Sequence, residues 1–345
     1  MTAPEAPVSS QSQPDDPSEG EVKDPGVVSR RRAKKRWRRT LTFYFFILPP
    51  ILLVSFLPLS VARALGDFLG TLGYIFASRE RKLAMKNLQA ALPERSLREL
   101  KKICRSNFRH VTCTILEFLI VHRWSFEKVD RAFGLGEDFR RADKSTGDNG
   151  CLIVAGHYGN WELLAGIYAR YFPEKIVAVS TTYPNHKIHE FMEKARQAFG
   201  MEMIYTEESP RRFLQAIRNG KTVGVLPDQN LRAPSGIFVP FFGRPAYTTT
   251  LPANLTRTLK APLFVALLER KRRGFKLHFT KVFDAWTNDR EADLLAATEA
   301  WSRELEARYR ERPEQWVWFH NRWLTQPGEE KKYVAHRWVR KQRKE

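Results

Sequence analysis

Residues 151–162, CLIVAGHYGNWE, decide the fold of this chain. The run Cys151–Ala155 is short, continuous and apolar, and it follows the turn signal Asp148-Asn149-Gly150, which is typical of a buried strand in a wound α/β sheet. Three similar runs lie at 176–180, 222–226 and 263–268, with helical stretches near 160–171, 187–199 and 210–219. The sequence therefore predicts an α/β fold with a mixed sheet flanked by helices.

Two longer helices can be predicted from the residues at their ends. Ser96 and Glu99 match a capping box, and apolar residues at helical spacing follow them, so a long amphipathic helix is expected there. A second helix is expected from about Asp289 to just before Pro313.

The turn after the first strand holds the residues best suited to catalysis. His157 is expected at the carboxyl end of its strand, where α/β sheets bind ligands, and Gly156 and Gly159 are expected to leave room for a substrate. Glu162 is expected to hydrogen-bond one ring nitrogen, so that the other nitrogen can take a proton from a hydroxyl. We therefore predict that His157 and Glu162 activate a hydroxyl toward an acyl thioester, with a structural histidine as the alternative.

A second polar cluster, Asp228-Gln229-Asn230, follows another apolar strand and is expected at the same sheet edge as His157. Asp228 is a candidate for positioning a substrate or orienting a neighbouring cation, and a turn cap is the alternative. Phe238–Gly243 forms an aromatic stretch suited to an acyl chain or to a core. The segment 313–323 alternates aromatic and polar residues, which strand packing also explains.

Other reaction classes lack their motifs. No G-x-S-x-G occurs, so a serine hydrolase is unsupported. Gly220-Lys221-Thr222 resembles the end of a phosphate-binding loop, but Gln215 stands where the first glycine is needed. The histidines show no metal-ligand spacing. We therefore expect no metal and no bound cofactor.

The composition indicates an anionic partner and a reducing compartment. The 58 Lys and Arg against 38 Asp and Glu give a net charge of +20, which favours acidic lipid, a phosphorylated substrate or nucleic acid. Cys104, Cys113 and Cys151 form no C-x-x-C pair, so neither a disulfide framework nor a thiolate zinc site is expected.

The two ends of the chain differ from its middle. Residues 1–29 are expected to be a disordered acidic tail, and residues 326–345 a basic tail. In residues 30–62, the basic cluster RRRAKKRWRR precedes an uncharged run from Leu41 to Ala62, which is long enough to span a bilayer. Because prolines interrupt this run, an interfacial hairpin competes with a span, and a cleaved signal peptide is a further alternative. We expect this region to anchor the protein to a membrane through an N-terminal helix.

Four motifs, in this order and at these separations, resemble the lysophospholipid acyltransferase superfamily and, within it, the late acyltransferases of lipid A biosynthesis. They are GHYGNWE at 156–162, VGVLPDQN at 223–230, GIFVPFFGRPAYTTT at 236–250 and PEQWVWFHNRW at 313–323. The resemblance covers about residues 41–325 and implies a glycerolipid-acyltransferase-like fold, with the acyltransferase domain at 63–325. It implies transfer of a fatty acyl chain from acyl carrier protein or coenzyme A, as co-substrate, to a hydroxyl of an anionic lipid A precursor. The place implied is the cytoplasmic face of the bacterial inner membrane.

The resemblance also implies roles for individual residues. His157 would be the general base and Glu162 its orienting partner. The residues expected to contact substrate are Asn160, Arg196, Asp228, Gln229 and Arg322. Among them, Asp228 and Arg322 match family positions, and their roles as substrate contacts are our inference. Arg196 matches a basic position that we assign to a phosphate or to the oxyanion.

Two departures from the family pattern concern the acceptor. The segment 181–185, TTYPN, stands where many members carry Arg-Pro, and Asn321 stands where an arginine is common. These departures leave another glycolipid or a lysophospholipid open as the acceptor. Outside enzymes, the alternative is a membrane-tethered protein that binds anionic lipid or nucleic acid without activity.

Overall fold

The protein is described from a computed structural model, which covers residues 48–147, 149–183, 185–206, 210–231 and 236–330. The expected acidic tail at 1–29, the basic cluster at 30–39 and most of the expected basic tail at 326–345 lie outside these residues.

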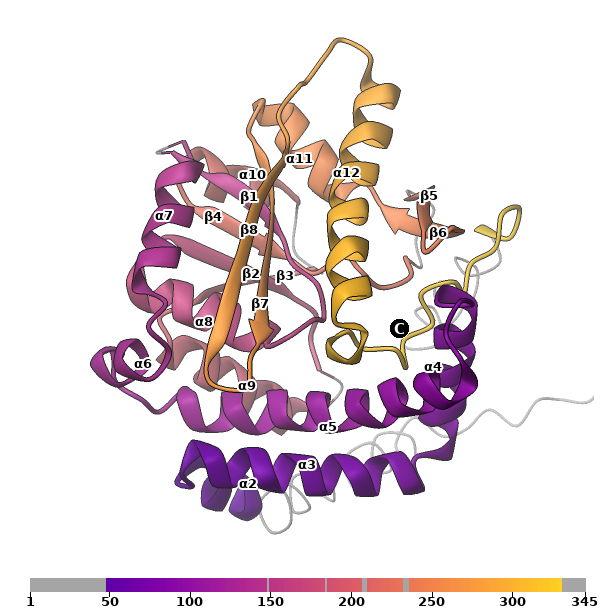
Figure 1. Cartoon of the computed structure of the whole chain (residues 1–345). Helices are drawn as coiled ribbons and strands as arrows, with labels where there is room; N and C mark the ends of the chain where they lie inside the picture. The colour runs from indigo at the N-terminus through magenta and orange to yellow at the C-terminus, as the bar shows by residue number, and fades with distance from the viewer. Residues whose placement is uncertain (1–47, 148, 184, 207–209, 232–235, 331–345) are drawn as a thin grey trace, which may run out of the picture.

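A six-stranded mixed sheet forms the centre of the protein, in the order β3-β2-β4-β1-β7-β8 (Figure 1). All neighbouring strands run parallel except β7 and β8, which are antiparallel. The strands are β1 (Cys151–Val154), β2 (Ile176–Ser180), β3 (Glu202–Tyr205), β4 (Thr222–Val225), β7 (Leu263–Arg270) and β8 (Phe275–Phe283). The mixed α/β fold is thus confirmed, and the four strands expected from apolar runs form where they were predicted.

Helices cover both faces of the sheet. On β1, Cys151 and Ile153 face one layer of helices, and Leu152 and Val154 face the other. The first layer is α5 (Leu97–Val121), α6 (Phe126–Phe133), α7 (Gly136–Thr146), α8 (Trp161–Tyr171) and α9 (His186–Ala198). The second is α10 (Pro210–Arg218), α11 (Leu251–Leu259) and α12 (Arg290–Glu311), which pack with α4 (Ser78–Ala91). Because side chains on both faces of the strands are buried against helices, apolar residues follow one another without interruption along these strands.

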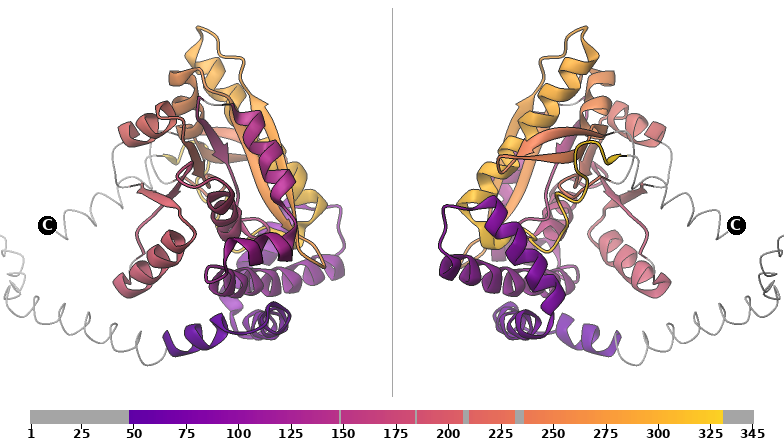
Figure 2. Two further views of the ribbon diagram at one scale, coloured as in Figure 1. Left: turned by 90° about the vertical axis from the view of Figure 1, so that its left-hand side faces the viewer. Right: turned by 90° about the vertical axis from the view of Figure 1, so that its right-hand side faces the viewer.

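The antiparallel hairpin of β5 (Gly236–Phe241) and β6 (Arg244–Thr249) stands apart from the main sheet, near the C-terminal end of the described chain (Figure 2). The aromatic C-terminal motif does not form a strand. It begins with a short 3-10 helix, η2 (Pro313–Gln315), and continues as turns that pack on Phe241 and Phe242 of the hairpin.

The N-terminal helices form a layer below the sheet in the view of Figure 1, with α3 (Leu59–Phe76) lying along α5 on the side away from the sheet. α5 begins with the expected capping box between Ser96 and Glu99. α3 approaches α5 closely because Gly70 has no side chain: a Cβ there would lie 2.4 Å from the Cα of Arg109.

The single anchoring helix expected within 41–62 is not present in the described part of that run. α2 (Leu48–Ser55) ends before Pro58, and α3 starts directly after it, because a proline cannot continue the hydrogen-bond pattern of the preceding helix. Among the residues that the structure describes, no helix combines the length and apolarity needed to cross a bilayer.

Candidate active site

The loop Gly156–Asn160 joins β1 to α8 and places His157 at the carboxyl edge of the sheet. The glycines were expected to leave room for a substrate, but the structure fills that room with protein atoms. A Cβ on Gly156 would lie 1.7 Å from the hydroxyl of Tyr309, and one on Gly159, where φ is +59°, would lie 2.0 Å from the carbonyl oxygen of Leu268. The loop is therefore held in one conformation by its surroundings.

Asp228, three residues after the end of β4, is hydrogen-bonded to His157. Its carboxylate is almost fully buried and accepts hydrogen bonds at 2.7 Å from both the ring Nδ1 and the backbone N–H of His157. The indole of Trp316 at 2.9 Å and the hydroxyl of Tyr309 at 3.2 Å donate to the same carboxylate. Because Nδ1 carries the proton that faces Asp228, the lone pair of the neutral ring lies on Nε2, on the side of the ring away from Asp228.

Glu162 does not take the orienting role that was expected of it. Its carboxylate forms a two-point ion pair with Arg196 of α9, with N–O distances of 2.8 and 3.2 Å, while Asp228 occupies Nδ1 of His157. Sequence spacing pointed to Glu162 because it lies one helical turn after the histidine. It could not reveal that Asp228, 71 residues further along the chain, reaches the same nitrogen.

Arg196, expected to bind a phosphate or the oxyanion, is buried and already bound within the protein. Besides Glu162, it donates to Ser180 Oγ at 3.1 Å and to the hydroxyl of Tyr183 at 3.2 Å. Tyr183 belongs to the segment that departs from the family pattern, so the departure supplies a partner for this arginine.

Asn160 and Arg322, two further expected substrate contacts, are both fully buried. Asn160 caps α8 and donates to Glu117 of α5 at 2.7 Å. Arg322 donates to the backbone carbonyls of Gln229 and Tyr247 and, at 2.6 Å, to Thr248 Oγ1. These two residues hold the loops of the site in place and face the protein interior.

Gln229 is exposed and lies beside Nε2 of His157. Its side-chain amide nitrogen is 3.2 Å from Nε2 of His157 and 3.1 Å from Nε2 of His320. The two imidazole rings are 5.4 Å apart between centroids. His320 was quoted within the aromatic motif but not proposed as a site residue, because its position beside Gln229 depends on how the C-terminal segment folds back.

The charges around His157 and His320 shift the pKa values of both histidines. Burial would lower the pKa of His157, but the charge and hydrogen bond of Asp228 and the charge of Glu162 raise it above its ordinary value. Burial would raise the pKa of Asp228, but its contacts with His157 and Trp316 hold it well below its usual range, so it stays ionised. Burial and the charge of His157 lower the pKa of His320 to about 4, so His320 is neutral near pH 7.

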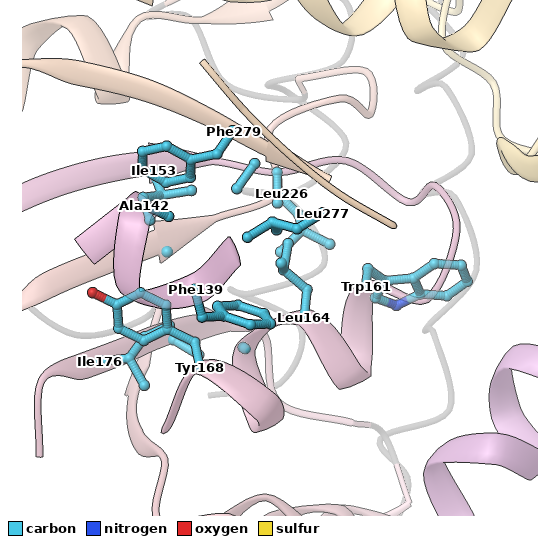
Figure 3. A pocket seen from close by; sticks show the side chains of 15 residues that line it. Phe139, Ala142, Ile153, Trp161, Leu164, Tyr168, Ile176, Leu226, Leu277 and Phe279 are labelled. Carbon is cyan, nitrogen blue, oxygen red and sulfur yellow. The ribbon is translucent and has the colours of Figure 1, made fainter. Parts of the chain in front are cut away.

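A narrow apolar cavity runs from the catalytic edge into the protein between the sheet and α8. Figure 3 shows Trp161 at one end of it and Tyr168 and Ile176 at the other, with Phe139 and Leu164 between them. Trp161 also packs against the ring of His157, with centroids 5.5 Å apart. Leu164 and Ala165 line the cavity between Trp161 and Tyr168, so the lining follows one face of α8 for about 10 Å.

A partly exposed histidine held by a buried aspartate, beside an apolar cavity, suits base-assisted transfer of an acyl group. In agreement, the chain belongs to the bacterial lipid A biosynthesis acyltransferase family, whose model matches residues 31–325. It is therefore an O-acyltransferase, and the resemblance to the lipid A branch is confirmed.

Curated relatives are similar over most of their length. The lipid A biosynthesis palmitoleoyltransferase of Escherichia coli (strain K12) is 25% identical over 285 residues, which cover 81% of this chain and 90% of that protein. The lipid A biosynthesis lauroyltransferase of the same organism is 25% identical over 281 residues, covering 80% and 89%. A lipid A biosynthesis acyltransferase of Haemophilus influenzae is 26% identical over 278 residues, covering 78% and 83%.

Proposed function

We propose that this protein transfers a fatty acyl chain from an acyl thioester, carried by acyl carrier protein or coenzyme A, to a hydroxyl of a lipid A precursor. The observation that carries the proposal is the position of His157, whose Nδ1 is held by Asp228 while Nε2 lies at the open sheet edge beside an apolar cavity. No bound cofactor is needed for this reaction, since the thioester is already activated.

In the proposed reaction, His157 Nε2 takes the proton of the acceptor hydroxyl as that oxygen bonds to the thioester carbonyl carbon. The π electron pair moves to the carbonyl oxygen. When the pair returns, the C–S bond breaks, and the thiolate takes the proton from His157. Asp228 stabilises the imidazolium that exists between these two steps.

The apolar cavity is proposed to take the acyl chain. Among the residues that the structure describes, no charged side chain lines it, and the ring of Trp161 lies both at its end and against His157. A chain with its carbonyl at His157 would place its methylenes on the far side of Trp161, where burial stabilises each by about 0.8 kcal/mol.

We propose that the protein docks on the cytoplasmic face of the bacterial inner membrane through the outer side of α2 and α3. α3 buries its small residues Ala62, Gly66 and Gly70 and leaves large apolar side chains outside, which reverses the usual arrangement. Of the twelve exposed large apolar side chains in the described chain, eight belong to this surface: Leu52, Leu53, Phe56, Val61, Phe68, Leu69, Ile75 and Phe76.

Charge around this surface fits an anionic membrane. Residues 59–109 hold eleven Lys and Arg against four Asp and Glu. Near a surface of anionic lipid, each such cation contributes about 1 kcal/mol. α5 separates this surface from the catalytic loop, because His110 and Thr114 of α5 contact the carbonyl oxygen of Gly159 at 2.9 and 3.0 Å. A lipid acceptor would therefore need to reach past only one helix.

The proposal is tested by mass spectrometry of lipid A and total lipid from cells that lack the gene and are complemented with wild type or His157→Ala. Loss of one acyl chain from lipid A, restored by wild type alone, is expected. Unchanged lipid A together with a change in another glycolipid or phospholipid would replace the acceptor, and equal restoration by His157→Ala would refute the mechanism.

A further inference from the structure

We infer that the side-chain amide of Gln229 donates a hydrogen bond to the thioester oxyanion, and that His320 is a positioning residue that holds this amide in place. The inference rests on the proposed function. It assigns to these two residues the stabilisation of the carbonyl oxygen, which the His157–Asp228 pair does not provide. The base removes a proton, but the carbonyl oxygen gains negative charge at the same time and needs a donor.

The backbone of the catalytic loop cannot supply that donor from residues 157–160. Each of the four N–H groups already donates within the protein, and the acceptors are Asp228 Oδ2 and the carbonyl oxygens of Gly156, Gln315 and Leu268. Any donor from this loop would have to give up an internal hydrogen bond, at a cost of about 1–3 kcal/mol for the group left unsatisfied.

Gln229 has the right group at the right place. An amide NH₂ has two N–H bonds, and here one reaches Nε2 of His157 while the other reaches Nε2 of His320. The acceptor hydroxyl must take the place of Gln229 at Nε2 of His157 before its proton can be removed. The N–H released in this way stays beside the attacking oxygen. The oxyanion is bonded to the same carbon as that oxygen, so it forms within reach of this N–H, which must come about 3 Å from it to act as a donor.

His320 keeps the amide nitrogen turned toward the reaction. Its neutral ring accepts one N–H of Gln229 at 3.1 Å, which an amide rotated by 180° could not provide. The backbone at His320 is itself fixed, since Asn87 of α4 donates to its carbonyl oxygen at 2.7 Å and to that of Trp318 at 2.8 Å. From the other side, Arg322 holds the backbone carbonyl of Gln229. The donor is thus in position before substrate binds, which is what makes such a group effective.

The test uses the purified full chain with lauroyl-coenzyme A and a lipid A precursor that lacks secondary acyl chains. Release of coenzyme A thiol reports cleavage of the thioester, and mass spectrometry reports the acylated lipid. Gln229→Met keeps the size of the side chain but removes both N–H groups. It is expected to lower kcat by about 10²- to 10³-fold with little change in KM. Gln197→Met, at an exposed position of α9, is the matched control and is expected to behave as wild type.

His320 is tested through Gln229. His320→Phe is expected to lower kcat about tenfold, and His320→Gln, whose carbonyl can accept the same N–H, is expected to recover part of the loss. Because His320 acts through Gln229, the double variant Gln229→Met/His320→Phe is expected to be no slower than Gln229→Met alone. The acidic limb of the pH profile is expected to stay in place in His320→Phe.

The inference would be overturned if Gln229→Met kept full kcat, or if that variant only raised KM. It would also be overturned if the losses in kcat of the two single variants multiplied in the double variant, or if His320→Phe shifted the acidic limb of the pH profile. Failure of the proposed function is seen separately. Thiol release by the wild type without acylation of lipid A refutes the acceptor but leaves the effect of Gln229→Met on thiol release measurable. A wild type that releases no thiol, either from lauroyl-coenzyme A or from lauroyl-acyl carrier protein, refutes both.

Discussion

Asp228→Asn is the substitution whose effect can be worked out most fully from the structure. Oδ2 of Asp228 accepts three hydrogen bonds, from the backbone N–H of His157, from Trp316 and from Tyr309, whereas Oδ1 faces only Nδ1 of His157. An asparagine must turn its carbonyl toward the three donors. Its NH₂ group then faces Nδ1, which forces the proton of the neutral imidazole onto Nε2.

That tautomer has no lone pair where the acceptor hydroxyl lies, so the base is disabled although its position is unchanged. A wrong tautomer of this kind, together with the lost stabilisation of the imidazolium, costs about 10³- to 10⁴-fold in kcat. The residual activity should also change its pH dependence. The rate requires unprotonated His157 and falls as pH drops through its pKa, which Asp228 raises. Removal of the carboxylate should therefore move the acidic limb to lower pH.

The assay measures the initial rate as a function of pH for Asp228→Asn, Glu162→Gln and the wild type. The control is Asp284→Asn, which replaces an exposed carboxylate that is paired with Lys281. Glu162→Gln is expected to lose about tenfold at most, because Glu162 contributes to the pKa of His157 only through its charge and is bonded to Arg196. A folded Glu162→Gln variant that is as inactive as Asp228→Asn would refute the assignment of the orienting carboxylate.

Three further predictions concern stability, chain length and membrane binding. The carboxylate of Glu117 is buried between Arg63 and Arg270, with N–O distances of 2.7 and 2.6 Å. Glu117→Gln should therefore lower the free energy of unfolding, measured in urea, by about 3–5 kcal/mol. A loss under about 1 kcal/mol would contradict a buried ion pair. Gly224→Val adds a side chain to the wall of the apolar cavity. When the variant is offered acyl donors of several chain lengths, mass spectrometry should find that it transfers shorter chains than the wild type. An unchanged distribution of chain lengths would mean that the acyl chain binds elsewhere. Phe68 is exposed on the outer side of α3. Phe68→Glu should reduce the amount of protein that floats with anionic vesicles at least several-fold, without lowering the melting temperature. Undiminished flotation would exclude this surface as the membrane-docking face.

The sequence predicted the part of the fold that depends on local pattern. The apolar runs at β1, β2, β4 and β7 and the capping box at Ser96 each depend on residues close in the chain, and all of them form as predicted. β3, β8 and the β5–β6 hairpin were not predicted. β8 lies at the edge of the sheet, where Phe275 alone of its nine residues is buried, and its antiparallel pairing with β7 depends on the turn near Gly274.

The site was predicted as a set of residues but not as a set of contacts. His157, Asp228 and Gln229 meet, because the carboxyl ends of neighbouring parallel strands share one edge of the sheet. The partner of His157 was assigned to Glu162 because the two are close in sequence, whereas burial and the opposite charge of Arg196 decide where that carboxylate points. The N-terminal anchor and the tails that fall outside the described residues stay predictions.

The measurement that tests the central claim most directly is acyl transfer in vitro by the purified full chain and by His157→Ala, with lauroyl-acyl carrier protein or lauroyl-coenzyme A and a lipid A precursor. The account predicts one added acyl chain with the wild type and a loss of at least about 10³-fold with His157→Ala, at unchanged folding and vesicle binding. Equal rates for the two proteins would contradict it.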